Sequence, residues 1–120
     1  MKYAVDFDST LAVYHPGDFH KYGPLILGEP IEPMVRQVKA WLRQGIEVVI
    51  FTARDPISWA LISKWTEEHI GTRLMVTNVK TWDIDAFYDD KTFHVIPNTG
   101  EIVDTDLYLQ YKAFWLEKGN

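Results

Sequence analysis

Two aspartates near the N-terminus, Asp6 and Asp8, are the residues whose type and spacing most directly suggest chemistry. They stand at the end of an apolar run over residues 3–7, a pattern typical of a strand buried in a parallel sheet. Side chains alternate along a strand, so residues two apart point to the same side. Both carboxylates are therefore expected at one edge of the sheet, and ligands of open α/β sheets bind beyond the carboxyl ends of the strands.

These two carboxylates would repel each other without a cation between them. At about 4 Å and an effective dielectric constant of about 20, two like charges repel by about 4 kcal/mol. A hard divalent cation that prefers oxygen ligands, such as Mg²⁺, is the expected partner. The alternative, from these residues alone, is that the aspartates end a strand in a solvated turn, with Ser9 and Thr10 capping the chain that follows.

Every predicted strand ends in a residue that could do chemistry. Beyond the first, apolar runs predict strands at residues 46–51, 73–77 and 85–90. The polar residues at the four strand ends are, in chain order, Asp6 and Asp8, then Thr52, then Lys80, then Asp89 and Asp90. A turn or a solvent-exposed strand end would explain any one of these residues. If none of them had a function, such an explanation would have to hold at every strand end at once. The pattern therefore favours one site at the carboxyl edge of the sheet.

The elements between these strands are predicted to be helices. Residues 33–44 carry apolar side chains at helical spacing, and Gly45 is placed to end the helix. Asp55 and Pro56 are typical of a helix start, and a second helix is expected to continue to residue 68 or 70. Its inward side chains are expected to be Ile57, Leu61, Ile62 and Trp65. The order strand, helix, strand predicts right-handed crossovers and a parallel sheet.

Three further segments complete the expected organisation. Residues 12–30 are irregular and punctuated by Gly and Pro, so they form a long loop that can overhang the aspartates and act as a specificity flap. Its candidates for contacting a substrate are Tyr14, His15, His20, Lys21 and Tyr22. Residues 93–96 and 101–103 flank a turn and predict a hairpin, and residues 105–118 predict a final helix.

Length and composition fit one soluble domain over residues 1–120, with 47% hydrophobic residues. The net charge of −5, with no run of Lys or Arg longer than a pair, argues against broad electrostatic binding of nucleic acid. Cysteine is absent, which excludes disulfides and thiolate zinc sites. The chain starts in a strand and has no apolar run near ~20 residues, so we expect a cytoplasmic protein that does not contact a membrane.

The residues at the four predicted strand ends belong to four short motifs. In chain order these are V-D-F-D-S-T-L at residues 5–11, V-V-I-F-T-A-R at 48–54, the lysine of T-N-V-K at 77–80, and F-Y-D-D at 87–90. In this order they resemble the motifs of the haloacid dehalogenase-like phosphatase superfamily. The resemblance covers roughly residues 2–90 and is to the small members without an inserted cap domain. It implies a three-layer, Rossmann-like parallel sheet with helices on both faces and the first strand central, followed here by the hairpin and a C-terminal helix.

The resemblance also implies a reaction, the hydrolysis of phosphate monoesters through an aspartyl-phosphate. Asp6 would be the nucleophile and Asp8 the general acid and base. Thr52 would donate its hydroxyl to a phosphoryl oxygen, and Lys80 would offset negative charge. The implied Mg²⁺ ligands are Asp6, the backbone carbonyl of Asp8, Asp89 and Asp90, with direct contact from Asp90. Residues expected to bind the substrate are Ser9, Thr10, Thr52, Ala53, Arg54 and His20.

Two other functions fit parts of this pattern. A receiver domain of a signalling system also combines acidic residues, a threonine, a lysine and Mg²⁺, but its lysine comes last, whereas Lys80 precedes the final acidic pair. A binding protein that has lost catalysis could share the fold, although all matched catalytic positions are filled. For the phosphatase, the expected partner is a small phosphorylated substrate, such as a nucleotide or a sugar phosphate, or the end of a polynucleotide, and no membrane.

Overall fold

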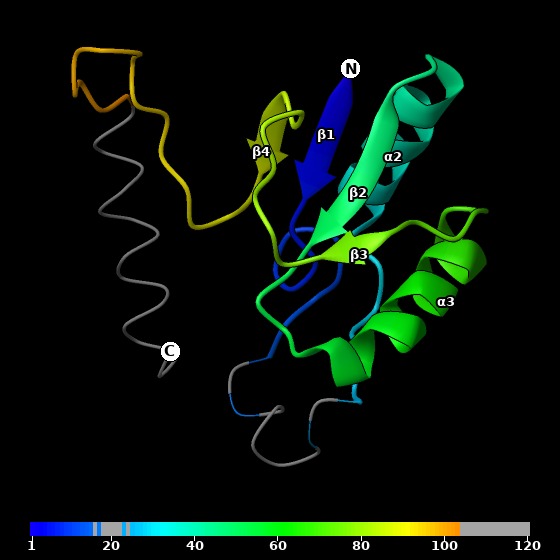
Figure 1. Ribbon diagram of the computed structural model, residues 1–120. Coiled ribbons are helices and arrows are strands. Elements are labelled where there is room, and N and C mark those ends of the chain that lie inside the picture. Colours follow the sequence, from blue (N-terminus) through cyan, green and yellow to red (C-terminus); the bar gives the residue numbers. More distant parts are fainter. Residues whose placement is uncertain (16, 18–22, 24, 104–120) are drawn as a thin grey trace. The chain divides into compact units, whose positions relative to one another are not determined.

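The computed structural model describes residues 1–15, 17, 23 and 25–103 (Figure 1). The elements are β1 (Lys2–Val5), α2 (Glu32–Arg43), β2 (Glu47–Phe51), the 3₁₀ turn η1 (Pro56–Ser58), α3 (Trp59–His69), β3 (Val76–Thr77) and β4 (Ala86–Tyr88). The chain forms two compact units, of which the first is Met1–Asp89 and the second begins at Asp90. Within the described ranges, no helix has the length and apolar character needed to cross a membrane.

The first unit is an α/β structure around a four-stranded sheet with the order β3-β2-β1-β4. All three strand pairings are parallel, which confirms the predicted parallel sheet. β1 lies between β2 and β4, as expected for the central strand. Val5 is paired with Ile50 on one side and with Tyr88 on the other, so the carboxyl ends of β1, β2 and β4 lie at the same edge.

The core lies between the sheet and the helices. Tyr3 of β1 packs edge-on against Trp41 of α2, with ring centroids 5.0 Å apart, and Phe7 packs in the same manner against Trp65 of α3, also at 5.0 Å. Val5 and Ile50 are fully buried in the same cluster of side chains. Because Tyr3, Val5 and their partners on the neighbouring strands point to one face, this face carries the helices.

The helix at residues 33–44 is confirmed, and its neighbour starts later than predicted. The 3₁₀ turn at Pro56–Ser58 precedes α3, and Ile57 in this turn and Leu61 in α3 have exposed fractions of 66% and 37%. The expectation that these two side chains point inward was wrong, whereas Ile62 and Trp65 are buried as predicted. Asp55 occupies the position before the turn but makes no capping hydrogen bond.

The chain enters β4 without a helix. The segment between β3 and β4 is held against the start of β1: the Asp85 backbone N–H donates to the Lys2 carbonyl at 2.8 Å, and the Lys2 ammonium donates to Asp83 at 3.1 Å. The hydrogen bond from Thr81 and the bond from Lys2 lower the pKa of Asp83. β3 and β4 are both shorter than predicted, because backbone pairing of these strands is confined to a few residues each.

The described part of the second unit contains the predicted hairpin. Val95 and Ile102 form an antiparallel bridge, and the Val103 N–H donates to the His94 carbonyl at 2.9 Å. Asn98, in the turn, has a φ of 64°, a conformation that asparagine tolerates better than most residues. The helix predicted at residues 105–118 lies outside the described residues.

The two ends of the segment 12–30 pair with each other in antiparallel orientation. Ala12 and Pro30 form a bridge, and the Val13 N–H donates to the Glu29 carbonyl at 2.8 Å. Gly28 lies so close to this pairing that a Cβ atom there would stand 1.8 Å from the Val13 carbonyl oxygen. The base of the predicted flap is therefore a closely packed pair of backbone segments.

Replacing Gly28 with alanine is expected to destabilise the protein by about 2–3 kcal/mol, because the obstacle is backbone that cannot rotate away. Urea unfolding followed by circular dichroism measures the change. Gly45→Ala is the matched control, since Gly45 has a φ of 83° but open space around it, and backbone strain alone costs about 1–2 kcal/mol. A Gly28→Ala protein as stable as the wild type would contradict the close packing.

Candidate active site

Asp6 and Asp89 lie side by side at the carboxyl edge of the sheet. The Asp6 N–H donates to the Tyr88 carbonyl at 2.9 Å, which extends the pairing of β1 with β4 by one residue. Asp90 follows directly in the chain, and carboxylate oxygens of Asp6, Asp89 and Asp90 lie within 4.8 Å of one another. All three side chains are half-buried. Such a group of oxygen ligands could hold a hard divalent cation.

The turn after Asp6 brings two hydroxyl groups to this edge. The Thr10 hydroxyl donates to the Asp6 carboxylate at 3.2 Å. Ser9 has a φ of 69°, in the left-handed region that serine seldom adopts. Its Oγ atom is buried and has no hydrogen-bond partner among the described residues. A buried hydroxyl without a partner at this edge is a donor available to a ligand.

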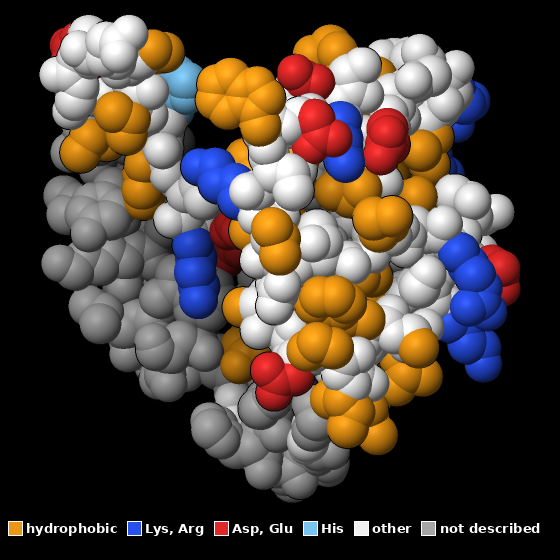
Figure 2. All heavy atoms as spheres, viewed as in Figure 1, with side chains coloured by type: hydrophobic (Ala, Val, Ile, Leu, Met, Phe, Trp, Pro, Cys, Tyr) orange, Lys and Arg blue, Asp and Glu red, His pale blue; other side chains and the backbone are white. Residues whose placement is uncertain are grey.

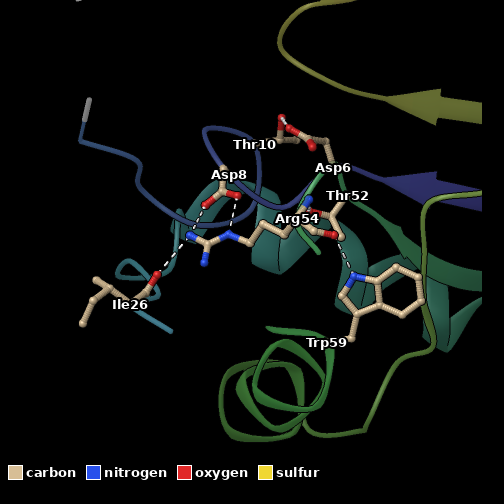
Figure 3. A network of polar contacts seen from close by, with 7 residues as sticks. All are labelled: Asp6, Asp8, Thr10, Ile26, Thr52, Arg54 and Trp59. Carbon is tan, nitrogen blue, oxygen red and sulfur yellow. Dashed lines mark hydrogen bonds and ion pairs between the residues drawn. The ribbon is translucent and has the colours of Figure 1, made fainter. Parts of the chain in front are cut away.

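Asp8 does not join the acidic group, because its carboxylate is bound by Arg54 (Figure 3). The guanidinium donates from Nε to one oxygen at 2.7 Å and from Nη2 to the other at 2.8 Å. The pair is largely shielded from solvent, with exposed side-chain fractions of 9% for Arg54 and 23% for Asp8. A two-bond pairing of a guanidinium with a carboxylate is a strong and geometrically specific polar contact.

Arg54 makes further contacts with the described residues around it. Its Nη2 also donates to the Ile26 carbonyl at 3.0 Å, and its own carbonyl accepts from the Trp59 indole at 2.9 Å (Figure 3). The guanidinium carbon lies 5.9 Å from the centre of the Phe7 ring. Arg54 therefore joins the end of β2, the segment after β1 and the return of the flap at Ile26.

Thr52 lies directly beyond β2 and is 3% exposed. Its hydroxyl oxygen accepts from the Arg54 backbone N–H at 3.1 Å, which leaves the hydroxyl hydrogen for another acceptor. Ala53, between them, is exposed at the same turn. These positions agree with the predicted place of the residues, at the strand end next to β1.

Lys80 lies near the edge without an ion pair in the described part of the chain. Its ammonium stands 5.3 Å from the centre of the Phe87 ring, and the side chain is exposed. Phe87 of β4 pairs with Ala4 of β1. Phe87 lies two residues before Asp89, and Ala4 lies two residues before Asp6. Lys80 is thus on the face of the sheet to which the aspartates belong, but the structure does not bring it into contact with them.

A pocket with a volume of about 380 Å³ opens beside Asp8 and Arg54. Its other walls come from both ends of the segment 12–30, and the residues that line them are Val13, Tyr14, His15, Ile26, Leu27, Gly28 and Glu29. Tyr14 and His15 were predicted to face a substrate. His20 lies outside the described residues. Glu29 and the apolar residues before it were not predicted to line the site. The signal that could have identified them is their position at the end of the segment 12–30, where the flap returns.

No family model matches the chain, and no curated protein matches it. One solved structure, of a conserved protein coded by a locus of Bacteroides thetaiotaomicron, is similar with a TM-score of 0.58. The similarity covers 98% of this chain and 91% of that chain, and the two sequences are 20% identical. The likeness is one of fold. It extends over almost the whole of both chains and carries no information about the reaction.

Proposed function

We propose that the chain is a Mg²⁺-dependent phosphatase that hydrolyses phosphate monoesters through an aspartyl-phosphate on Asp6, as the resemblance to haloacid dehalogenase-like phosphatases implies. The observation that carries the proposal is the group formed by Asp6, Asp89 and Asp90 at the carboxyl edge of a parallel sheet. Thr52, on the strand next to β1, lies at the same edge. The proposal includes the three-layer arrangement of that superfamily.

The reaction has two steps that use the side chains of this edge. In the first, an Asp6 carboxylate oxygen attacks phosphorus, the bond from phosphorus to the ester oxygen breaks, and the departing oxygen takes a proton from Asp8. In the second, water attacks phosphorus, gives a proton to Asp8, and releases inorganic phosphate and the Asp6 carboxylate. The Thr52 hydroxyl and the Ser9 hydroxyl donate to phosphoryl oxygens. This role is supported by the observation that neither hydroxyl donates to a described residue.

The acidic group fits Mg²⁺, because it offers oxygen atoms alone and has no nitrogen or sulfur ligand. Asp6, Asp89 and Asp90 would hold the ion, with the Asp8 carbonyl as the further ligand that the resemblance implies. When bound, the ion would offset the charge of the carboxylates and of the phosphoryl group. The Asp8 side chain takes no part in this group, because it is paired with Arg54.

Asp8 can act as acid and base only when Arg54 releases it, because both carboxylate oxygens are bound by the guanidinium. A phosphate dianion offers Arg54 a partner of higher charge than one carboxylate, in the same two-bond geometry. Substrate binding would therefore transfer Arg54 from Asp8 to the phosphate. In this way one residue binds the substrate and frees the general acid.

Replacing Arg54 with lysine is expected to lower kcat/KM by about 10- to 100-fold, because an ammonium group cannot bind two oxygens in a fixed geometry. Arg54→Ala should lose at least as much. Phosphate release at a series of substrate concentrations measures both constants. The matched control is Arg73→Lys, since Arg73 forms an exposed ion pair with Glu67 on α3. If Arg54 only restrained Asp8, its removal would raise kcat, and that result would contradict its role in binding phosphate.

A phosphate-release screen tests the proposed function. Purified protein with Mg²⁺ is incubated with nucleotides, sugar phosphates, aryl phosphates, acetyl phosphate, and oligonucleotides phosphorylated at the 3′ or 5′ end. The Asp6→Asn protein serves as the blank for every substrate. Continuous release that requires Asp6 supports a phosphatase, whereas a single labelling by acetyl phosphate without turnover would indicate a receiver domain.

A further inference from the structure

The pocket beside Asp8 and Arg54 is a feature of the candidate site that the reaction itself does not explain. We infer that it receives the leaving group of the phosphate ester, and that this group is uncharged and carries an apolar ring, as an aryl alcohol or a nucleoside does. The inference rests on the proposed function, because it assigns the part of the substrate that remains after the phosphate is placed.

The position of the pocket follows from the role of Asp8. A general acid must lie within hydrogen-bond distance of the oxygen that it protonates, so the leaving group lies next to Asp8. Asp8 forms one wall of the pocket, and Arg54, which would hold the phosphate, forms another. The phosphate and the leaving group would then be bound on either side of the ester oxygen. Figure 3 shows the Arg54 guanidinium bonded to the Asp8 carboxylate and to the Ile26 carbonyl.

The charges that line the pocket disfavour a second anionic group on the substrate. Asp8 and Glu29 contribute two carboxylates, and Arg54 is the sole Lys or Arg among the described lining residues. Arg54 is already shared between Asp8 and the Ile26 carbonyl. On the face shown in Figure 2, Lys and Arg side chains are scattered among acidic and apolar ones and form no continuous basic path. The described lining residues therefore offer little positive charge to a second phosphate on the substrate, as in a bisphosphate or a nucleic-acid strand.

The remaining walls suit an apolar ring. Val13, Ile26 and Leu27 provide aliphatic surface, and Tyr14 and His15 provide rings. The volume of about 380 Å³ lies within the range of about 300–1,000 Å³ that is typical of small-molecule pockets. A phenyl group or a nucleoside fits within it and can contact its walls, whereas a methyl or acetyl group offers little surface for such contacts.

These walls are fixed in place before any ligand binds. The Val13 N–H donates to the Glu29 carbonyl at 2.8 Å, and the Trp65 indole donates to the Gly28 carbonyl at 2.9 Å. Arg54 holds the Ile26 carbonyl from the other side at 3.0 Å. The return of the flap is thus tied to β2, α3 and residue 13, so the ligand does not have to order these walls.

The test compares two substrates that differ by one charge on the leaving group, phenyl phosphate and 4-carboxyphenyl phosphate, with acetyl phosphate as a small reference. We expect the wild-type kcat/KM for phenyl phosphate to exceed that for the carboxylated substrate by about tenfold or more. Glu29→Lys should shift this ratio by about tenfold toward 4-carboxyphenyl phosphate, with a milder shift for Glu29→Gln. Glu68→Lys, the same charge reversal on the exposed side of α3, should leave the ratio unchanged.

The outcomes separate the inference from the proposed function. If Asp6-dependent phosphate release occurs but both aryl substrates are used equally, or Glu29→Lys leaves their ratio unchanged, the leaving group does not occupy this pocket and the phosphatase assignment stands. If no substrate, including acetyl phosphate, gives Asp6-dependent release, the proposed function fails and the inference fails with it. The Glu29 side chain is exposed and its structural contact is made by its backbone, so both substitutions should fold.

Discussion

Replacing Asp6 with asparagine is expected to reduce phosphate release by at least about 10³-fold on every substrate that the wild type hydrolyses. An amide oxygen is a weak nucleophile and cannot form the acyl phosphate, so the first step is lost rather than slowed. The fold should survive, because Asn keeps an oxygen that can accept from the Thr10 hydroxyl and keeps the backbone N–H that donates to Tyr88. Steady-state phosphate release and thermal unfolding together measure the two effects.

The matched control for this substitution is Asp55→Asn. Asp55 is exposed, lies before the 3₁₀ turn and makes no capping hydrogen bond, so its loss should change neither turnover nor stability by a measurable amount. Unchanged turnover in the Asp6→Asn protein would show that the phosphate comes from a contaminant or from another site. The binding-protein alternative would then be preferred, since fold alone does not imply catalysis.

The sequence predicted the sheet because its signals are local. The apolar run before Asp6, the helical spacing of residues 33–44 and the run at residues 46–51 each specify one element, and the helical connections between β1, β2 and β3 favour parallel strands. The meeting of Asp6 with Asp89 depends in addition on the pairing of β4 with β1, and the chain enters β4 without a helix. Once β1 and β4 are parallel neighbours, residues at their ends must lie side by side.

The parts that the sequence did not predict depend on contacts between distant residues. The pairing of Asp8 with Arg54 joins residues 46 positions apart, and nothing in either motif says that the arginine turns toward the aspartate rather than toward a substrate. Lys80 was expected to offset charge at the acidic group, but in the structure its ammonium stands 5.3 Å from the centre of the Phe87 ring. Long, flexible side chains have many rotamers, so their contacts are the least predictable from spacing.

The orientation of Ile57 was mispredicted for a related reason. A helix that begins directly at Pro56 would place Ile57 on the inner face with Trp65, and the sequence pattern favours this. The structure instead forms a 3₁₀ turn first, which changes the number of residues per turn before α3 begins at Trp59. The bond from the Trp59 indole to the Arg54 carbonyl fixes this start, and it is a tertiary contact that periodicity does not encode.

Removing divalent cations is expected to lower turnover by at least about 100-fold, and added Mg²⁺ should restore it. Asp6, Asp89 and Asp90 place carboxylate oxygens within 4.8 Å of one another, and a phosphate dianion would add two more negative charges at the same edge. At about 4 Å and an effective dielectric constant of about 20, each like-charged pair costs about 4 kcal/mol. Lys80 makes no ion pair with the acidic group in the described structure, and a bound divalent cation would offset the negative charge at this edge.

Dialysis against EDTA followed by titration with Mg²⁺ measures this dependence. Asp89→Asn and Asp90→Asn should each raise the Mg²⁺ concentration for half-maximal activity by about tenfold or more, with the larger effect at the direct ligand, whereas Asp55→Asn should leave it unchanged. Mg²⁺ should also raise the unfolding temperature of the wild type and not that of Asp89→Asn, which separates binding from catalysis. Full turnover in EDTA-treated protein would exclude a metal-dependent reaction at this edge.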